Sequence, residues 1–196
     1  MTDPVDLAWL TSPGEVTPLL RQQLAGCWQE VANTGGAVGF PFPPVSDSDV
    51  ASAVAGMVSA LDLPENRILT AGTNSRLAGW LFLAGNSSKL TAHWARVLRV
   101  QTALDFRGHG VGRALMSEAA RAAAEDFALE QLHLELRSGL GLEGFYRSCG
   151  WRETGRWPGA LRLPAGDRDE VLMVLDLQHT AEVAGAEPPL PERQDL

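Results

Sequence analysis

The first sixty residues carry apolar positions at the spacing of α-helices. Over residues 15–31 they recur every three or four positions, which places them on one face of a helix. Ser46 or Asp47 can cap a second helix that runs to about Leu61. A loosely alternating run over residues 5–11 precedes both helices. This part of the chain therefore predicts one strand followed by two helices.

After residue 66 the pattern changes to shorter apolar runs that are typical of strands. Residues 67–71 and 77–84 flank a turn at 72–75 and predict a hairpin. The further elements are a long strand over 92–104, a helix over 110–127, a strand over 131–137, a short helix over 142–149, a strand opening at Gly150 and Trp151, and a last strand over 170–177.

The order of the elements is β-α-α-β-β-β-α-β-α-β-β, which combines an antiparallel meander with one β-α-β crossover. This order favours an α/β fold with a single mixed sheet and helices packed on its faces. No linker divides the chain, so we expect residues 1–178 to form one domain. The tail over 179–196 is rich in Ala, Glu and Pro, and we expect it to be disordered.

Composition and charge narrow the class of protein. The 196 residues are 45% apolar and 20% charged, which is the balance of an ordinary globular domain. The formal net charge of −8 argues against a general nucleic-acid binder and favours a cationic or neutral small substrate. No Cys/His spacing resembles a zinc site, so we expect no metal.

Three features bear on the compartment of the protein. The acidic start over residues 1–4 lacks the basic and apolar regions of a signal peptide. No apolar run approaches the roughly 20 residues that a membrane span needs. The two cysteines, Cys27 and Cys149, lie far apart in the sequence. We therefore expect a cytoplasmic protein with reduced thiols and no membrane partner.

A glycine-rich loop, Arg107-Gly108-His109-Gly110-Val111-Gly112, joins the long strand to the next helix. Its glycines let the backbone approach an anion closely, and the helix that follows offers unpaired N–H groups and a positive dipole end. Arg107 and Arg113 add positive charge. The loop therefore predicts a phosphate-binding site, and the alternative is a tight turn that binds nothing.

Two common glycine loops do not fit this segment. A Walker loop needs Gly-Lys-Ser/Thr after four intervening residues, and that triplet is absent. The dinucleotide fingerprint would need a glycine where Arg113 stands. Both ATP-type and dinucleotide-type sites are thereby excluded.

The spacing Arg107-x-x-Gly110-x-Gly112 resembles motif A of the GNAT superfamily of N-acetyltransferases, whose loop wraps the pyrophosphate of coenzyme A. About 35 residues on, residues 145–151 resemble motif B of that family. The resemblance covers roughly residues 67–177. It implies the GNAT fold, with a central mixed and mostly antiparallel sheet of about seven strands and helices on both faces. It also implies acetyl-CoA, or another acyl-CoA, as the donor.

The resemblance assigns cofactor contacts to named residues. In the family the third and fourth strands splay near Thr102, and the pantetheine arm lies in the gap. The residues that would hold the cofactor are Val100, Gln101 and Thr102 on the strand and Arg107, Gly108, His109, Gly110, Val111, Gly112 and Arg113 in the loop and first helical turn.

Tyr146 is the only tyrosine of the chain and lies in the second motif. In the family the matching tyrosine protonates the departing CoA thiolate. A phenol has a pKa of about 10 and a thiol has a pKa of about 8.5. A positioned phenol can give its proton to the thiolate if the site narrows the difference between the two pKa values. The alternative is a ring that packs in the core. Direct transfer in a ternary complex needs no enzyme nucleophile, so we expect Cys149 to be a core residue.

Segments outside the two motifs look like the tabtoxin-resistance-like branch of the family, namely residues 35–40, 92–97 and 155–159. Members of that branch acetylate small amines, including amino-acid-like antimetabolites. The branch commonly has an acidic residue where Arg96 stands. An arginine cannot act as a base, but it can bind a substrate carboxylate or phosphate. The alternative is an arginine on a solvated face.

Further acceptor-side candidates follow from the same branch or from side-chain type. Glu135 matches an acidic position of the branch and could orient the amine or take its proton, or else it faces solvent. His93 is a second candidate base by side-chain type alone. Four aromatic residues are candidate walls of the acceptor pocket, with core packing as the alternative: Trp28, Phe40, Phe42 and Trp157.

The sequence therefore predicts an enzyme that transfers acetyl from acetyl-CoA to a primary amine of a small molecule. Two alternatives stay open: a non-catalytic acyl-CoA-binding regulatory module, and a peptide or protein N-acetyltransferase. The proline-rich segment over 39–44 predicts a rigid loop and an enclosed acceptor site, which favours the small amine. Homodimers are common in the superfamily, and no residue of this chain decides for or against one.

Overall fold

A computed structural model describes residues 5–36, 39–40, 42–73 and 75–178 of the chain. The predicted tail over 179–196 lies outside the described residues. The strands are β1 (Asp6–Leu10), β2 (Asn66–Thr73), β3 (Arg76–Ala84), β4 (Trp94–Thr102), β5 (Gln131–Arg137), β6 (Arg152–Leu161) and β7 (Arg168–Asp176). The α-helices are α1 (Pro18–Asn33), α2 (Asp47–Ser59), α3 (Val111–Glu125) and α4 (Leu142–Ser148).

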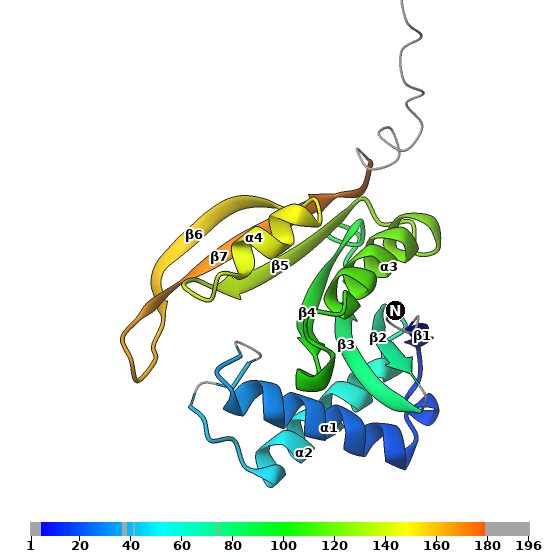
Figure 1. Cartoon of the computed structure of the whole chain (residues 1–196). Helices are drawn as coiled ribbons and strands as arrows, with labels where there is room; N and C mark the ends of the chain where they lie inside the picture. The colour runs from blue at the N-terminus through cyan, green and yellow to red at the C-terminus, as the bar shows by residue number, and fades with distance from the viewer. Residues whose placement is uncertain (1–4, 37–38, 41, 74, 179–196) are drawn as a thin grey trace, which may run out of the picture.

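The seven strands form one sheet in the order β1-β2-β3-β4-β5-β7-β6 (Figure 1). All neighbours pair antiparallel except β4 and β5, which pair parallel and are joined through α3. A parallel pair needs such a crossover, and a helix is its usual form. The mixed, mostly antiparallel sheet of seven strands predicted from the sequence is thereby confirmed.

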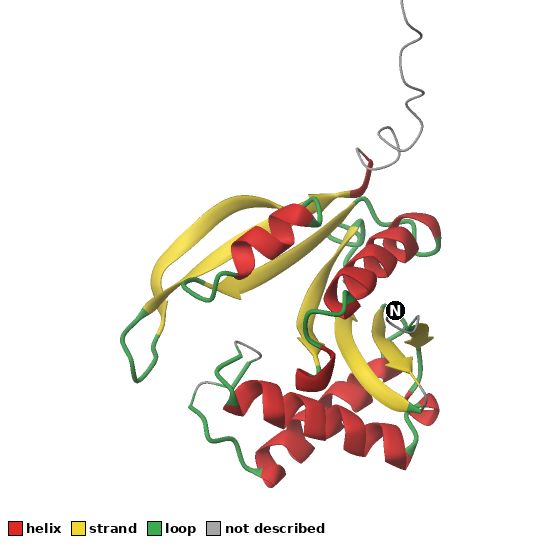
Figure 2. Ribbon diagram, in the orientation of Figure 1, coloured by secondary structure: helices red, strands yellow, loops and turns green. Residues whose placement is uncertain are grey.

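Helices cover both faces of the sheet, as predicted (Figure 2). On one face α3 buries Leu115, Met116 and Ala119 in a core with residues of β2 to β5 and β7. On the other face α1 and α2 form a second core. The buried strand residues of that core are Ile68 of β2 and Trp80 and Phe82 of β3. No described residue of β5, β6 or β7 belongs to this second core, so α1 and α2 do not cover that part of the sheet.

The helix starts follow local chemistry. The first helix begins at Pro18, after the predicted start, because Thr17 caps it and accepts a hydrogen bond from the Leu20 amide. Of the two residues predicted to cap the second helix, Ser46 does so by accepting from the Asp49 amide. Each cap accepts a bond from an amide that has no partner within the helix.

One expectation about the strands is wrong. The third and fourth strands do not splay near Thr102, because β3 and β4 stay paired as far as Gly79 and Thr102. The gap opens instead between β4 and β5, whose pairing stops after Arg96 and His133. A register shift on β4 opposite Trp80 to Phe82 marks a β-bulge there. Such a bulge bends its strand, which agrees with the divergence of β4 from β5.

Candidate active site

A cavity of about 840 Å³ occupies the gap between β4 and β5. Residues 97–102 of β4 form one wall, and residues 134–137 of β5 form the facing wall. The glycine loop before α3 lines one end of the cavity, and the segment after α1 lines the other. The end lined by the glycine loop is called the donor end below. The end lined by β5, β7 and the segment after α1 is called the acceptor end.

The donor end is built from backbone. Gly108 and Gly110 have φ angles of +78° and +82°, a region that L-residues with a side chain rarely adopt. Gly110 is the N-cap of α3 and no side chain caps the helix there, so the amides of its first turn are open to a ligand. A Cβ on Gly112 would lie 3.3 Å from the Phe145 ring, which shows how closely α4 approaches the loop.

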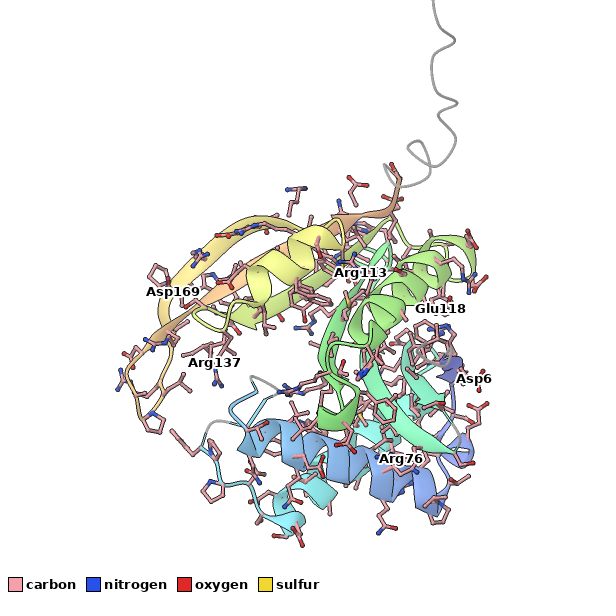
Figure 3. The ribbon with its side chains drawn as sticks, in the orientation of Figure 1. Asp6, Arg76, Arg113, Glu118, Arg137 and Asp169 are labelled. Atoms are coloured by element: carbon pink, nitrogen blue, oxygen red, sulfur yellow. The ribbon has the colours of Figure 1, made fainter. Side chains whose placement is uncertain are left out.

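The loop side chains lie in different places. Arg107 lines the cavity, whereas His109 is exposed and is not among the residues that line it. Arg113 lines the cavity, but its guanidinium also donates to the Ser148 carbonyl at 3.1 Å and to Ser148 Oγ at 3.0 Å. Figure 3 shows Arg113 between α3 and α4. Arg113 thus links the two helices, a contact that the sequence did not predict.

The predicted strand contacts, Val100 to Thr102, all line the cavity. The Ala103 amide donates to the Ala78 carbonyl of β3 at 2.9 Å. Because backbone groups alternate along a strand, those of Thr102 point away from β3, toward the gap. The side chain of Gln101 is buried, and neither its Oε1 nor its Nε2 has a partner among the described residues.

Tyr146 lies on α4 and lines the cavity, with 8% of its surface exposed. Its ring packs edge-on against Phe145 and Trp151, at centroid distances of 5.1 Å and 6.2 Å. Burial, with a smaller contribution from Cys149, raises the pKa of Tyr146 to about 12. The phenol is therefore neutral at ordinary pH. Its pKa lies further from that of a thiol than expected, so a hydrogen bond to a thiolate is favoured over full proton transfer.

The acceptor end holds four charged side chains. Glu135 and Arg137 project from β5, and Glu170 projects from β7 directly opposite Arg137. Burial, and then the nearby charge of Glu135, raises the pKa of the Glu170 carboxyl. Arg99 completes the set from the bulge of β4. Glu135 lies on the strand predicted over 131–137, and because the gap opens between β4 and β5, it lines the cavity.

Both Arg96 and Arg99 are exposed, but only Arg99 lines the cavity, so the arginine at the acceptor end is a different one from the predicted Arg96. Arg99 has a φ of +56° in the bulge, which turns it out of the strand alternation. Its guanidinium carbon lies 5.6 Å from the ring centroid of Trp28. Burial lowers the pKa of Arg99. No sequence pattern marks the bulge, which explains why sequence reasoning passed over Arg99.

The four aromatic candidates do not line the cavity, and Phe42 is 59% exposed. Trp28 is buried beneath Arg99 and packs on Phe40 at 5.2 Å and on Trp80 at 5.3 Å. Phe40 is half-buried against the α1 and α2 core, and Trp157 is 54% exposed on β6. Their contacts fit the packing alternative for Trp28 and Phe40, and they provide no aromatic enclosure of the acceptor end.

The remaining candidates lie outside the cavity. His93 is exposed and does not line it. Cys149 is half-buried and packs against the α3 core. Over the residues that the structure describes, no three His, Cys, Asp or Glu side chains group as metal ligands. Within the same residues, no helix has both the length and the apolar character needed to cross a membrane.

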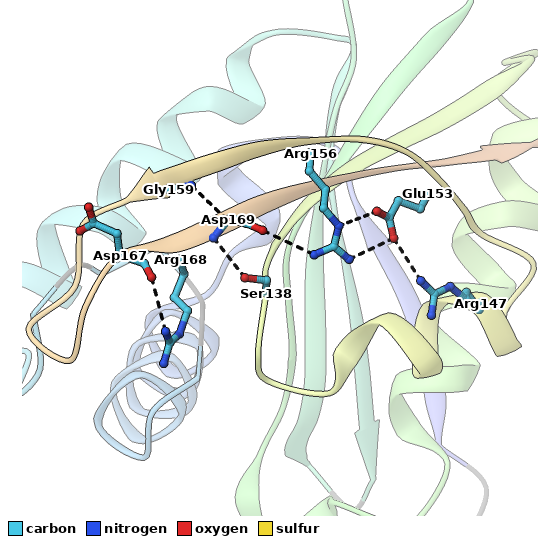
Figure 4. A network of polar contacts seen from close by, with 8 residues as sticks. All are labelled: Ser138, Arg147, Glu153, Arg156, Gly159, Asp167, Arg168 and Asp169. Carbon is cyan, nitrogen blue, oxygen red and sulfur yellow. Dashed lines mark hydrogen bonds and ion pairs between the residues drawn. The ribbon is translucent and has the colours of Figure 1, made fainter.

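A polar network braces the wall that carries Glu135 and Arg137 (Figure 4). Glu153 bridges Arg147 of α4 and Arg156 of β6, at 3.1 Å and 2.6 Å. Asp169 of β7 accepts from the Gly159 amide at 3.0 Å, and its own amide donates to Ser138 Oγ at 3.1 Å. These contacts join β6, β7, α4 and the end of β5 beside the acceptor end.

Comparison with known proteins agrees with this geometry. A family model described as an acetyltransferase (GNAT) domain matches residues 64–153. The chain resembles the solved structure of the yncA acetyltransferase from Salmonella typhimurium with its cofactor acetyl-CoA, at a TM-score of 0.70 and 15% identity, over 89% of this chain and 95% of that one. A search of curated proteins by sequence finds no match.

Two further solved structures share the fold but differ in their acceptors. One is an aminoglycoside 6'-N-acetyltransferase complexed with coenzyme A, at a TM-score of 0.68 and 14% identity, over 95% of this chain and 99% of that one. The other is the ribosomal-protein-S18-alanine N-acetyltransferase from Escherichia coli, at 0.66 and 16%, over 96% and 99%. At such identities the likeness shows the fold.

Proposed function

Because a model of the acetyltransferase (GNAT) domain matches residues 64–153, we propose that the chain is a GNAT enzyme that transfers acetyl from acetyl-CoA to a primary amine of a small molecule. Transfer occurs by direct attack in a ternary complex, within residues 1–178 acting as one domain. The observation that carries the proposal is a single cavity that joins the glycine loop, Tyr146 and Glu135. Backbone amides for a pyrophosphate, a phenol O–H and a carboxylate thereby lie around one space.

The donor end suits acetyl-CoA by its chemistry. The open amides at the start of α3, the positive φ angles of Gly108 and Gly110, and the charge of Arg107 would hold a pyrophosphate. The free edge of β4 at Thr102 would hydrogen-bond the pantetheine amides as a neighbouring strand does. When bound, acetyl-CoA supplies the acetyl group as an activated thioester.

The chain's own residues then have separate tasks. Glu135 orients the amine and takes its proton, directly or through a water, because the attacking amine must be neutral. Tyr146 donates its O–H as a hydrogen bond toward the site where negative charge develops on the leaving sulfur. Its burial keeps the phenol protonated for this task. Cys27 takes no part, because burial raises its pKa to about 11 and holds it as a thiol.

The small-amine acceptor rests on two supports. The cavity volume of about 840 Å³ falls in the range of small-molecule sites. The segments that look like the tabtoxin-resistance-like branch point to small amines as well. A protein acceptor is the second candidate, because the structurally similar ribosomal-protein-S18-alanine N-acetyltransferase shares this fold and the aromatic residues predicted to enclose the acceptor end do not line the cavity.

A thiol-release assay over a panel of amines and N-terminal peptides tests the proposal. We expect turnover with small primary amines and a marked loss of turnover in Tyr146→Phe. Native mass spectrometry with acetyl-CoA separates the alternatives. Cofactor binding without turnover of any acceptor supports the regulatory module, turnover of peptides alone supports the protein acceptor, and no cofactor binding contradicts all three.

A further inference from the structure

The arginines of the acceptor end have no carboxylate partner, unlike five other arginines of the described chain. Arg76, Arg121, Arg147, Arg156 and Arg162 each form an ion pair. None of these five lines the cavity. Arg99 and Arg137 both line it, and within the described residues neither forms an ion pair.

Arg137 has a partly buried guanidinium with an N–H group that is unpaired within the described residues, and a bound anion would supply the missing hydrogen bond. Its Nε atom is buried and has no hydrogen-bond partner in the described structure. Burial lowers its pKa, which shows that the surroundings oppose its charge. Glu170 lies opposite it on β7 but does not reach ion-pair distance. Figure 3 shows the Arg137 side chain at the end of β5, directed toward the α1 side of the sheet.

Arg99 is held in position by its neighbours. The bulge fixes its backbone at a φ of +56°, and its guanidinium lies over the ring of Trp28. The guanidinium also lies against Gly39, where an added Cβ would meet it. Arg99 is exposed to the cavity, although burial around its guanidinium lowers its pKa. A cavity-lining guanidinium without a carboxylate partner is suited to bind an oxyanion through two hydrogen bonds.

The same end of the cavity carries two carboxylates. Glu135 and Glu170 project from the same face of neighbouring strands, and each is half-buried. The charge of Glu135 helps to raise the pKa of Glu170, so the two carboxylates lie close enough to repel each other. An ammonium group bound beside them relieves that repulsion. Two positive and two negative groups therefore face one space.

We infer that the acceptor is a small zwitterion, a primary amine that also carries an oxyanion group such as a carboxylate or phosphonate. Arg99 and Arg137 bind the oxyanion, and Glu135 receives the amine. The inference rests on the proposed acetyl transfer and adds the chemical class of the acceptor. It transfers the role that the sequence suggested for Arg96 to two other arginines.

A matched panel of amines tests this inference. Alanine, leucine, methionine and phenylalanine are compared with their primary amides, and 1-aminoethylphosphonate is compared with alanine to separate the two oxyanions. Thiol release gives KM, and calorimetric titration in the presence of coenzyme A gives affinity without turnover. We expect the oxyanion compounds to bind at least about tenfold more tightly than the amides, since charge-assisted hydrogen bonds are that strong.

The variants identify the residues. Arg99→Ala and Arg137→Gln are expected to remove the preference for the oxyanion, whereas Arg96→Ala keeps it. Equal affinity for acids and amides overturns the inference, even when no compound of the panel is acetylated. Loss of preference in Arg96→Ala alone also overturns it, as does an Arg99→Ala variant whose only defect is in acetyl-CoA binding. Failure of the proposed function itself has a different result, namely no binding of acetyl-CoA.

Discussion

The donor and acceptor ends of one cavity are built in different ways. The donor end consists of backbone: open amides at the start of α3, two glycines with positive φ, and the free edge of β4. The acceptor end consists of charged side chains on a bulge and on two strands. Backbone geometry needs glycines at fixed spacing and therefore leaves a mark in the sequence. Charged side chains at the acceptor end can come from many positions in the chain, so they follow no fixed spacing that the sequence would reveal.

Tyr146 lies between the two ends, and its removal is expected to have the largest effect. Tyr146→Phe keeps the ring packing on Phe145 and Trp151 but removes the O–H. We expect kcat to fall about 100-fold or more, with little change in KM for either substrate. Because the pKa of the phenol is about 12, ionisation of Tyr146 should cause no fall in kcat between pH 8 and 10. Unchanged kcat in the variant would remove the tyrosine from the mechanism.

The glycine loop tests the backbone character of the donor end. Gly110→Ala places a side chain at a φ of +82°, which costs about 1–2 kcal/mol of backbone strain. We expect the affinity for acetyl-CoA, measured by calorimetry, to fall about tenfold while the affinity for the acceptor stays the same. Gly26→Ala is the matched control, since an added Cβ there meets nothing within 4 Å. If both variants bind alike, the loop does not shape the donor site.

Two arginines of the donor end are expected to have different roles, one in binding acetyl-CoA and the other in positioning α4. Arg107 lines the cavity with an exposed side chain, whereas Arg113 is bonded to Ser148 of α4. We expect Arg107→Ala to raise the KM for acetyl-CoA about fivefold, the effect of one exposed charged contact. Arg113→Ala should instead lower kcat a few-fold, because α4 carries Tyr146. Steady-state kinetics with both substrates measures the difference, and identical profiles would assign both arginines to cofactor binding.

Sequence reasoning succeeded where local chemistry decides. The strand over 131–137, the cap at Ser46 and the helix after Gly110 follow from periodicity and capping, and the structure has them. It failed where the outcome depends on how two strands meet. The gap was expected one strand too early, because no sequence pattern marks the β4 bulge. Arg96 lies where β4 is still paired with β5 and does not line the cavity, whereas Arg99 in the bulge does.

The polar network behind the acceptor wall gives the smallest expected effect. Asp169 holds the Gly159 amide and lies 3.8 Å from Arg156, so Asp169→Ala loosens β6 against β7 beside Arg137 and Glu170. Exposed contacts of this kind contribute about 1 kcal/mol or less. We therefore expect the acceptor KM to rise about two- to threefold, with the KM for acetyl-CoA unchanged. Asp167→Ala is the control, since its ion pair with Arg162 joins two exposed side chains that do not line the cavity. If Asp169→Ala raises the KM for acetyl-CoA as well, the two ends are coupled through the sheet and are not independent sites.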